Sequence, residues 1–284
     1  MLTLVSLIWS SKVLAVGNCT YETSDKVINY NGDAMNDDIG ECAIAPASYK
    51  LTIYEIGVCT ASPTAPGVAA ADTSSCTAIF TNAAGRTVNI AVGSSLSLDK
   101  SIDLPTGSYG FSYISLSNRL GLTALVDFTN NDVMRDLDSS TGRYCWSESG
   151  TRYNSTSFEP PGGVSCSNTP GTPGEFIEIL DMLTDVGNFY ISDPDIPVAD
   201  GTMTAYITNT DGTLATAIQG AGGTKIFAIL TRTTPLTISD DTKAIDVQFS
   251  VNQALHPEVA NFGGGVYGIE GFGSGPFSAN ITSE

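Results

Sequence analysis

The sequence contains a single histidine, His256, among 284 residues, and none of its six cysteines belongs to a CxxC pair. A structural zinc site needs four thiolate or imidazole ligands, and a catalytic triad needs a base beside its nucleophile. Neither GxSxG nor HExxH occurs in the chain. The sequence therefore excludes a histidine-rich metal site and favours a protein that is not an enzyme and has no cofactor. We expect His256 to be a loop residue.

Basic residues are scarce, because 12 lysines and arginines stand against 30 aspartates and glutamates, for a net charge of −18. A surface this acidic repels phosphate backbones and anionic lipids, which argues against nucleic-acid binding and against docking on a membrane surface. It suits a protein kept soluble in a salty medium, or one that recruits divalent cations. Hydrophobic residues make up 42% of the chain, enough to form a real core.

Long hydrophobic runs are missing as well, and the only candidate is the short segment Met1–Ala15. Its apolar part, Leu2–Trp9, is well below the roughly 20 residues that span a bilayer. Val13-Leu14-Ala15 resembles a signal-peptidase site, so we expect a signal peptide over 1–15 and a secreted or cell-surface protein. No basic residue precedes the apolar part and Lys12 follows it. A retained hydrophobic N-terminal anchor is therefore the alternative.

The six cysteines agree with export, because disulfides persist in oxidising compartments. Six cysteines allow 15 connectivities in principle. Pairing between neighbours in the sequence is the simplest arrangement, and each such loop would contribute about 3 kcal/mol to stability in the chain-entropy model. The predicted disulfides are Cys19–Cys42, Cys59–Cys76 and Cys145–Cys166.

The stretch Leu104–Phe128 carries the clearest structural pattern. Apolar residues alternate with other residues from Leu120 to Phe128, which places one apolar row on one face of a strand. The polar triplet Ser117-Asn118-Arg119 before this row is typical of a hairpin loop. Tyr49–Cys59 and Ile245–Val251 show similar strand patterns. The sequence therefore predicts an all-β, antiparallel β-sandwich fold with little helix.

A strand with the sequence LTIYEIG (Leu51–Gly57), a strand–NxxG–strand segment (Ala78–Ile90) and LPxGxY before an aromatic strand (Leu104–Tyr109) follow one another. This combination resembles the prealbumin-like, CnaB-type β-sandwiches of secreted surface proteins, over Tyr49–Phe128 only. The resemblance implies a sandwich fold and a scaffold or adhesin role, with no catalytic residue. Members often carry Lys–Asn isopeptide bonds, and Lys50 lies on a suitable strand, although no partner can be assigned. Within the second segment, the turn should place Gly85 at positive φ.

A change of composition suggests a division of the chain. Residues 130–174 are rich in Asn, Asp, Ser, Thr, Gly and Pro, with strong breakers near the end. We predict a sandwich over 16–135, a disulfide-bracketed loop or linker over 136–174, and a second β-rich domain over 175–284. Phe176–Leu183 could be a helix or a strand. The tail Gly263–Phe277 alternates glycines with apolar residues and could lend a strand to a neighbouring molecule.

The bracketed loop holds the best binding candidates, since aromatic rings on a polar, stapled loop can stack on the apolar faces of sugars. The alternative is that these rings cover the underside of their own loop. The candidate ligand-binding residues are Tyr144, Trp146, Tyr153 and Phe158.

Three weaker motifs have simpler explanations. Gly263–Gly268 satisfies GxGxxG but is not followed by a helix pattern or the required acidic residue, so we expect a glycine segment. Asp72-Thr73-Ser74 faintly resembles an aspartic-protease loop but lies between cysteines without apolar flanks. An acidic cluster could hold Ca²⁺ but lacks EF-hand spacing, and a solvated loop is the simpler interpretation; it comprises Asp33, Asp37, Asp38 and Glu41.

Together these features favour an exported, self-associating structural subunit of a surface layer, pilus-like filament or virion exterior. The alternative is an adhesin that binds surface glycans through the aromatic loop. A third possibility, a secreted hydrolase, would need a deep acidic cleft.

Overall fold

The computed structural model describes residues 17–18, 27–28, 42–90, 104–128, 134–135, 142–153, 163–181, 183–185, 188–190, 192–198, 200–216, 223–242, 244–252, 254–263, 266–274 and 277–283. These residues form strands and connecting loops without a helix, so the predicted all-β class is confirmed. None of these segments offers a helix able to cross a membrane. The leader predicted over 1–15 lies outside the described residues.

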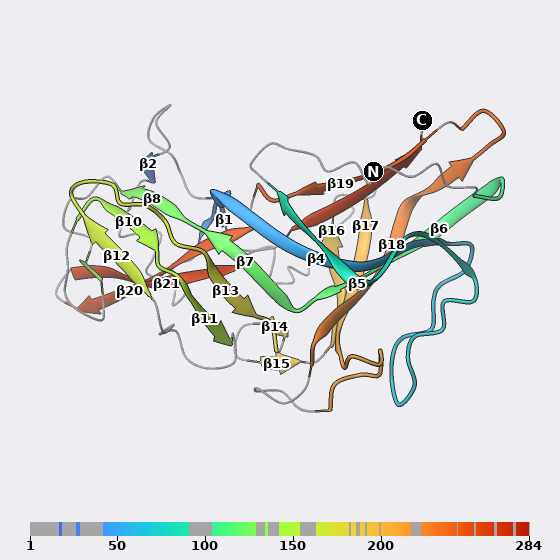
Figure 1. Ribbon diagram of the computed structural model, residues 1–284, viewed down its shortest axis with the longest axis horizontal. Helices are drawn as coiled ribbons and strands as arrows, with labels where there is room; N and C mark the ends of the chain where they lie inside the picture. The colour runs from blue at the N-terminus through green and yellow to red at the C-terminus, as the bar shows by residue number, and fades with distance from the viewer. Residues whose placement is uncertain are drawn as a thin grey trace, which may run out of the picture.

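The largest unit is a nine-stranded sheet in the order β11-β13-β7-β4-β6-β18-β17-β16, with β5 paired to β4 as well. The strands occupy the middle and right of Figure 1, where β4 crosses the molecule diagonally. Their bounds are β4 Ser48–Cys59, β5 Cys76–Ile90, β6 Gly107–Ser117, β7 Arg119–Thr123, β11 Gly150–Tyr153, β13 Phe176–Ile179, β16 Ser192–Val198, β17 Gly201–Thr208 and β18 Lys225–Ile238.

Smaller sheets complete the described structure. A four-stranded sheet has the order β12-β10-β8-β2, three strands follow the order β20-β21-β9, and β19-β22, β1-β3 and β14-β15 are pairs. Their bounds are β1 Gly17–Asn18, β2 Val27–Ile28, β3 Cys42–Ala43, β8 Leu125–Phe128, β9 Met134–Arg135, β10 Tyr144–Ser147, β12 Val164–Ser167, β14 Leu183–Asp185, β15 Asn188–Tyr190, β19 Ile245–Ser250, β20 Leu255–Gly263, β21 Val266–Ser274 and β22 Ser278–Ser283.

The predicted hairpin at Ser117-Asn118-Arg119 is wrong. β6 and β7 both run antiparallel to β4 along the same edge, with Ile53 opposite Leu116 and Lys50 opposite Gly121. The chain therefore continues through Asn118 instead of reversing. The polar triplet marks a change of neighbour, because β18 lies beside β6 whereas β13 lies beside β7. Alternation beyond the triplet is confirmed, since Leu120, Leu122, Ala124 and Val126 are all buried.

The NxxG segment is also not a hairpin turn. Both of its halves pair with β4 as parts of the single strand β5, and residues 82–85 bulge outward where the register shifts. Gly85 has φ of +80°, as predicted. A Cβ at Gly85 would come within 2.5 Å of the Thr52 side chain, so the position favours glycine for its backbone and for space.

The core lies between the nine-stranded sheet and the C-terminal strands, in a sandwich-like arrangement. Alternate residues of β4 point inward, and β19–β22 supply the facing layer. The buried residues from the two sides include Tyr49, Leu51, Ile53, Val247, Phe249, Ile269, Phe272 and Ile281. The opposite face of the sheet carries a second cluster of Cys59, Tyr113, Phe227 and Ile229, with Ala71 from the loop 60–75 packed against it.

Strands from both sides of Gly174 share the nine-stranded sheet, since β18 pairs with β6 and β13 pairs with β7. The sheet therefore does not divide at the predicted boundary. The ambiguous segment after Gly174 begins as strand β13. The glycine-rich tail forms β21, which pairs with β20 of the same chain and buries Ile269 and Phe272. This strand already has an intramolecular partner.

Tyr49 is fully buried, and its hydroxyl has no hydrogen-bond partner among the described residues. Burial, followed by the nearby Glu178 carboxylate, raises its pKa well above the usual value. We expect Tyr49→Phe to raise the free energy of unfolding by about 1 kcal/mol, because it removes an unpaired polar group and keeps the ring. Urea denaturation measures this change.

Tyr109→Phe is the matched control, because the Tyr109 hydroxyl donates a 2.8 Å hydrogen bond to the Pro105 carbonyl. This substitution should lower stability by about 1 kcal/mol. If both variants lose stability equally, the Tyr49 hydroxyl has a partner and the explanation is wrong.

Candidate functional site

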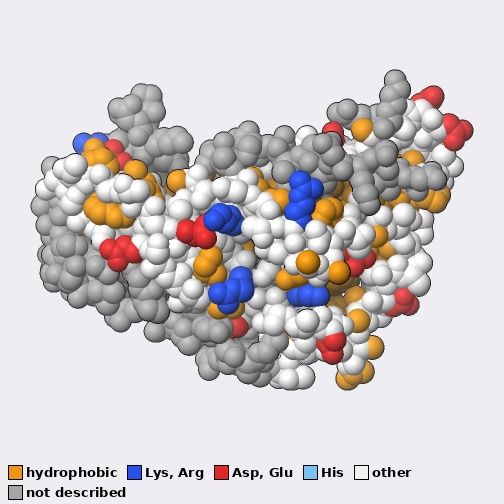
Figure 2. Space-filling model, in the orientation of Figure 1, with side chains coloured by type: hydrophobic (Ala, Val, Ile, Leu, Met, Phe, Trp, Pro, Cys, Tyr) orange, Lys and Arg blue, Asp and Glu red, His pale blue; other side chains and the backbone are white. Residues whose placement is uncertain are grey.

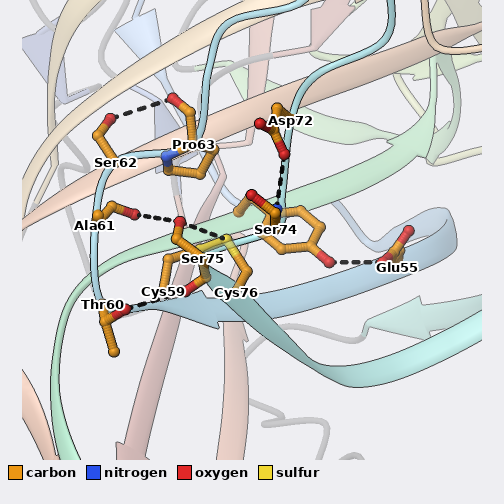
Figure 3. Close-up of a disulfide and its surroundings, with 11 residues drawn as sticks. Glu55, Cys59, Thr60, Ala61, Ser62, Pro63, Asp72, Ser74, Ser75 and Cys76 are labelled. Carbon is orange, nitrogen blue, oxygen red and sulfur yellow. Dashed lines mark hydrogen bonds between the residues drawn. A yellow bond between two sulfur atoms is a disulfide. The ribbon is translucent and has the colours of Figure 1, made fainter.

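Two of the predicted disulfides are present, and both join residues directly opposite each other on paired strands. Cys59 of β4 faces Cys76 of β5 (Figure 3), and Cys145 of β10 faces Cys166 of β12. Opposite residues in antiparallel strands bring their Cβ atoms close enough for a bridge. These bonds are consistent with an extracellular protein. Cys19 lies outside the described residues, so the first predicted pair does too.

The Cys145–Cys166 bond lies beneath two of the predicted binding residues, Tyr144 and Trp146. Strand alternation in β10 turns Cys145 and Ser147 inward, where both are buried, and turns Tyr144 and Trp146 to the outer face. Ser147 also anchors the loop between β12 and β13, because its hydroxyl donates to the Gly174 carbonyl at 2.7 Å. The disulfide and this hydrogen bond hold the two aromatic residues on a rigid support.

The outer side of the four-stranded sheet forms a surface that we call the β10 face, comprising Tyr144, Trp146, Leu125, Asp127 and Arg143. The register places Leu125 opposite Trp146 and Asp127 opposite Tyr144. Leu125 is 42% exposed, which is unusual for a large apolar residue in this molecule. Arg143 holds Asp127 through both oxygens, at 2.5 and 3.1 Å, and its guanidinium lies 5.6 Å from the centre of the Tyr144 ring.

Trp146 is supported from one side by the loop that follows β12. A Cβ at Gly171 would come within 2.2 Å of the indole ring, so the backbone there touches the ring directly. Trp146 remains partly exposed. The ring therefore covers part of its own loop and also contributes to the outer face, and its role in binding stays a prediction. The aromatic rings can stack on a sugar ring, and the charged groups of the neighbouring ion pair can form hydrogen bonds with its hydroxyls.

Of the other two aromatic candidates, only Tyr153 has a described backbone, and it lies on a different sheet. Tyr153 belongs to β11, in the nine-stranded sheet, and its side chain lies outside the described set, as does all of Phe158. The sequence reasoning missed Leu125, Asp127 and Arg143. Leu125 and Asp127 belong to the row that alternates with buried Ala124 and Val126, and this pattern marks them as outward-facing. It does not identify β10 as their neighbour.

A second surface lies on the nine-stranded sheet, on the side opposite the C-terminal layer. We call it the basic face; it comprises Lys50, Tyr54, Arg119 and Lys225. Lys50 pairs with Glu175, and the Lys225 ammonium lies 4.7 Å from the centre of the Tyr54 ring. Arg119 is exposed, with no side-chain partner in the described part of the chain. Figure 2 shows the Lys and Arg side chains gathered over the middle of the molecule.

The weaker motifs take ordinary structures. Ser74 N–H donates to the Asp72 carboxylate at 2.9 Å in an exposed loop (Figure 3), and this bond lowers the pKa of Asp72. Within the GxGxxG segment, Gly263 ends β20 and 266–268 begin β21, so the described part is strand and not the start of a helix. His256 belongs to β20, not to a loop as predicted, because a ladder to Gly273 includes it. Among the described residues there is no cluster of three potential metal ligands, and the segment 33–41 lies outside them.

Comparison with known proteins found no match to a family model, a curated protein or a solved structure.

Proposed function

We propose that the protein is an exported structural subunit of an extracellular assembly, such as a surface layer, a pilus-like filament or a virion exterior, without enzymatic activity. The observation that carries this proposal is the separation of charge on its surface. Three cationic side chains share the basic face of a chain whose net charge is −18. A surface so different from the rest of the molecule suits contact with another copy. The cross-strand disulfides suit a protein that stays folded in the oxidising environment outside the cell.

Negative-stain microscopy and analytical ultracentrifugation of the secreted protein at native salt test this proposal. We expect regular polymers, or a sedimentation coefficient that rises with concentration. A monomer at every salt and protein concentration, up to the solubility limit, would contradict the proposal.

A second candidate function, binding of surface glycans, is supported by the β10 face. We expect Trp146→Ala to weaken binding to any glycan recognised on an array at least about tenfold, because a buried aromatic contact is typically worth more than 1 kcal/mol. Gly171→Ala should weaken it as well, because the new methyl group displaces the indole ring. Isothermal titration with the best array ligand measures both effects.

Tyr54→Ala serves as the control, since it removes an aromatic ring from the basic face and leaves the β10 face intact. Equal binding by wild type and Trp146→Ala would remove this candidate function.

A further inference from the structure

We infer that the basic face binds the acidic turn Ser239–Thr242 of a second copy of this chain. The inference rests on the proposed function and specifies the contact through which the subunits join. Because the face and the turn are different surfaces, the contact is head-to-tail. Such a contact repeats into a ring or an open filament.

The cations of the basic face are only partly neutralised by side chains of their own chain. The face carries three cations: Lys50 pairs with Glu175, Lys225 interacts electrostatically with Asp211, and the Arg119 side chain has no acidic partner among the described residues. Lys50 and Arg119 lie on the adjacent strands β4 and β7, in register positions two residues apart. Lys225, on β18, also donates to the Thr210 carbonyl at 3.1 Å, and it lies beside the Tyr54 ring. Adjacent strands are about 4.8 Å apart, so one short acidic segment can reach all three cations.

The acidic turn has a shape suited to this role. Asp240 and Asp241 are exposed, and neither carboxylate has a partner among the residues described. The turn is held by hydrogen bonds from Thr242 N–H to the Ser239 carbonyl and from Ser239 N–H to the Thr242 hydroxyl, both 3.0 Å. Because it is already ordered, binding costs little conformational entropy.

The turn also stands clear of the sheet. β17 pairs with β18 only as far as Arg232, and β18 pairs with β6 again from Leu236 to Ile238, where the Ser283 hydroxyl also donates to the Thr237 carbonyl at 3.2 Å. In Figure 1 this end of β18 projects at the upper right of the molecule. Charge complementarity therefore favours the turn of a second copy as the occupant of the basic face.

Charge reversals on the full mature protein test the inference. Lys50→Glu with Arg119→Glu makes the face acidic, and Asp240→Lys with Asp241→Lys makes the turn basic. At about 0.15 M salt we expect each pair to raise the critical concentration for assembly about tenfold or more, and the four changes together to restore it. Light scattering measures assembly, and circular dichroism melts confirm that each variant folds.

The two pairs also separate a specific contact from a general charge effect. The first pair makes the chain more acidic and the second makes it less acidic, so simple repulsion between copies would change assembly in opposite directions. Opposite changes, or no change in either variant, would overturn the inference while leaving the proposed function intact. The inference would also be overturned if Lys50→Glu with Arg119→Glu abolished binding to a sulfated polysaccharide and left assembly unchanged. A wild-type protein that never assembles would instead contradict the proposed function itself.

Discussion

Asn118→Asp is expected to lower the free energy of unfolding by about 3 to 4 kcal/mol, the largest effect on stability that the structure predicts. Asn118 is 2% exposed and lies where β13 and β18 meet the β6–β7 strand. Its side-chain amide donates to the Leu180 carbonyl at 3.0 Å and to the Gly223 carbonyl at 2.8 Å. An aspartate has no proton to donate at neutral pH and places a negative charge against two carbonyl oxygens.

The backbone hydrogen bonds of Asn118 explain why the loss of stability extends beyond this residue. Asn118 N–H donates to the Thr224 carbonyl, and Leu180 N–H donates to the Asn118 carbonyl. One residue therefore joins the start of β18 to the end of β13, and both strands depend on it for their position. Chemical denaturation followed by tyrosine fluorescence measures the loss. At acidic pH the protonated aspartic acid can donate one hydrogen bond, so the deficit should shrink.

Asn82→Asp is the matched control. The Asn82 side chain accepts a 3.1 Å hydrogen bond from Ala84 N–H, and aspartate accepts it equally well. We expect a change below about 0.5 kcal/mol. Similar losses for both variants would show that Asn118 does not join the two strands.

Gly57→Ala is expected to lower the free energy of unfolding by about 3 kcal/mol. A Cβ at Gly57 would lie 2.2 Å from the Tyr113 ring, which packs across the glycine. Tyr113 is buried, stacks on Phe227 at 5.5 Å between ring centres, and donates a 2.6 Å hydrogen bond to Glu55. Burial and this hydrogen bond raise the pKa of Tyr113, so the hydroxyl stays protonated at neutral pH. Displacing the ring costs packing and leaves the carboxylate without its donor.

Gly110→Ala controls for the loss of a strand glycine, because a Cβ there would meet nothing within 4 Å. We expect it to be close to neutral. A double-mutant cycle supplies a second check, since Gly57→Ala should cost less when Tyr113 is already alanine. Thermal denaturation of the four proteins in the cycle measures the coupling, and additive losses would contradict the predicted overlap.

The β10 face shows which parts of a candidate binding surface follow from the sequence and which do not. Tyr144 and Trp146 are two residues apart on a strand, so their common face follows from alternation alone. Leu125 and Asp127 share that face only because β8 pairs with β10, and Gly171 supports the indole only because a loop returns over it. Pairing between distant segments leaves no trace in one sequence, so Tyr153, which belongs to a different sheet, could not be separated from Tyr144 and Trp146.

By itself, the sequence determined the all-β class, two of the local disulfides and the alternation that buries Leu120 to Val126, because each depends on residues close together in the chain. Only the tertiary structure decided that the chain runs straight through Asn118, that strands from both sides of Gly174 share one sheet, and that Lys50, Arg119 and Lys225 lie on one face of that sheet. Hydrogen bonds between strands form across any distance in the sequence. These hydrogen bonds are formed by backbone groups, which are the same in nearly every residue. Side-chain patterns therefore show where strands form and not which strands become neighbours.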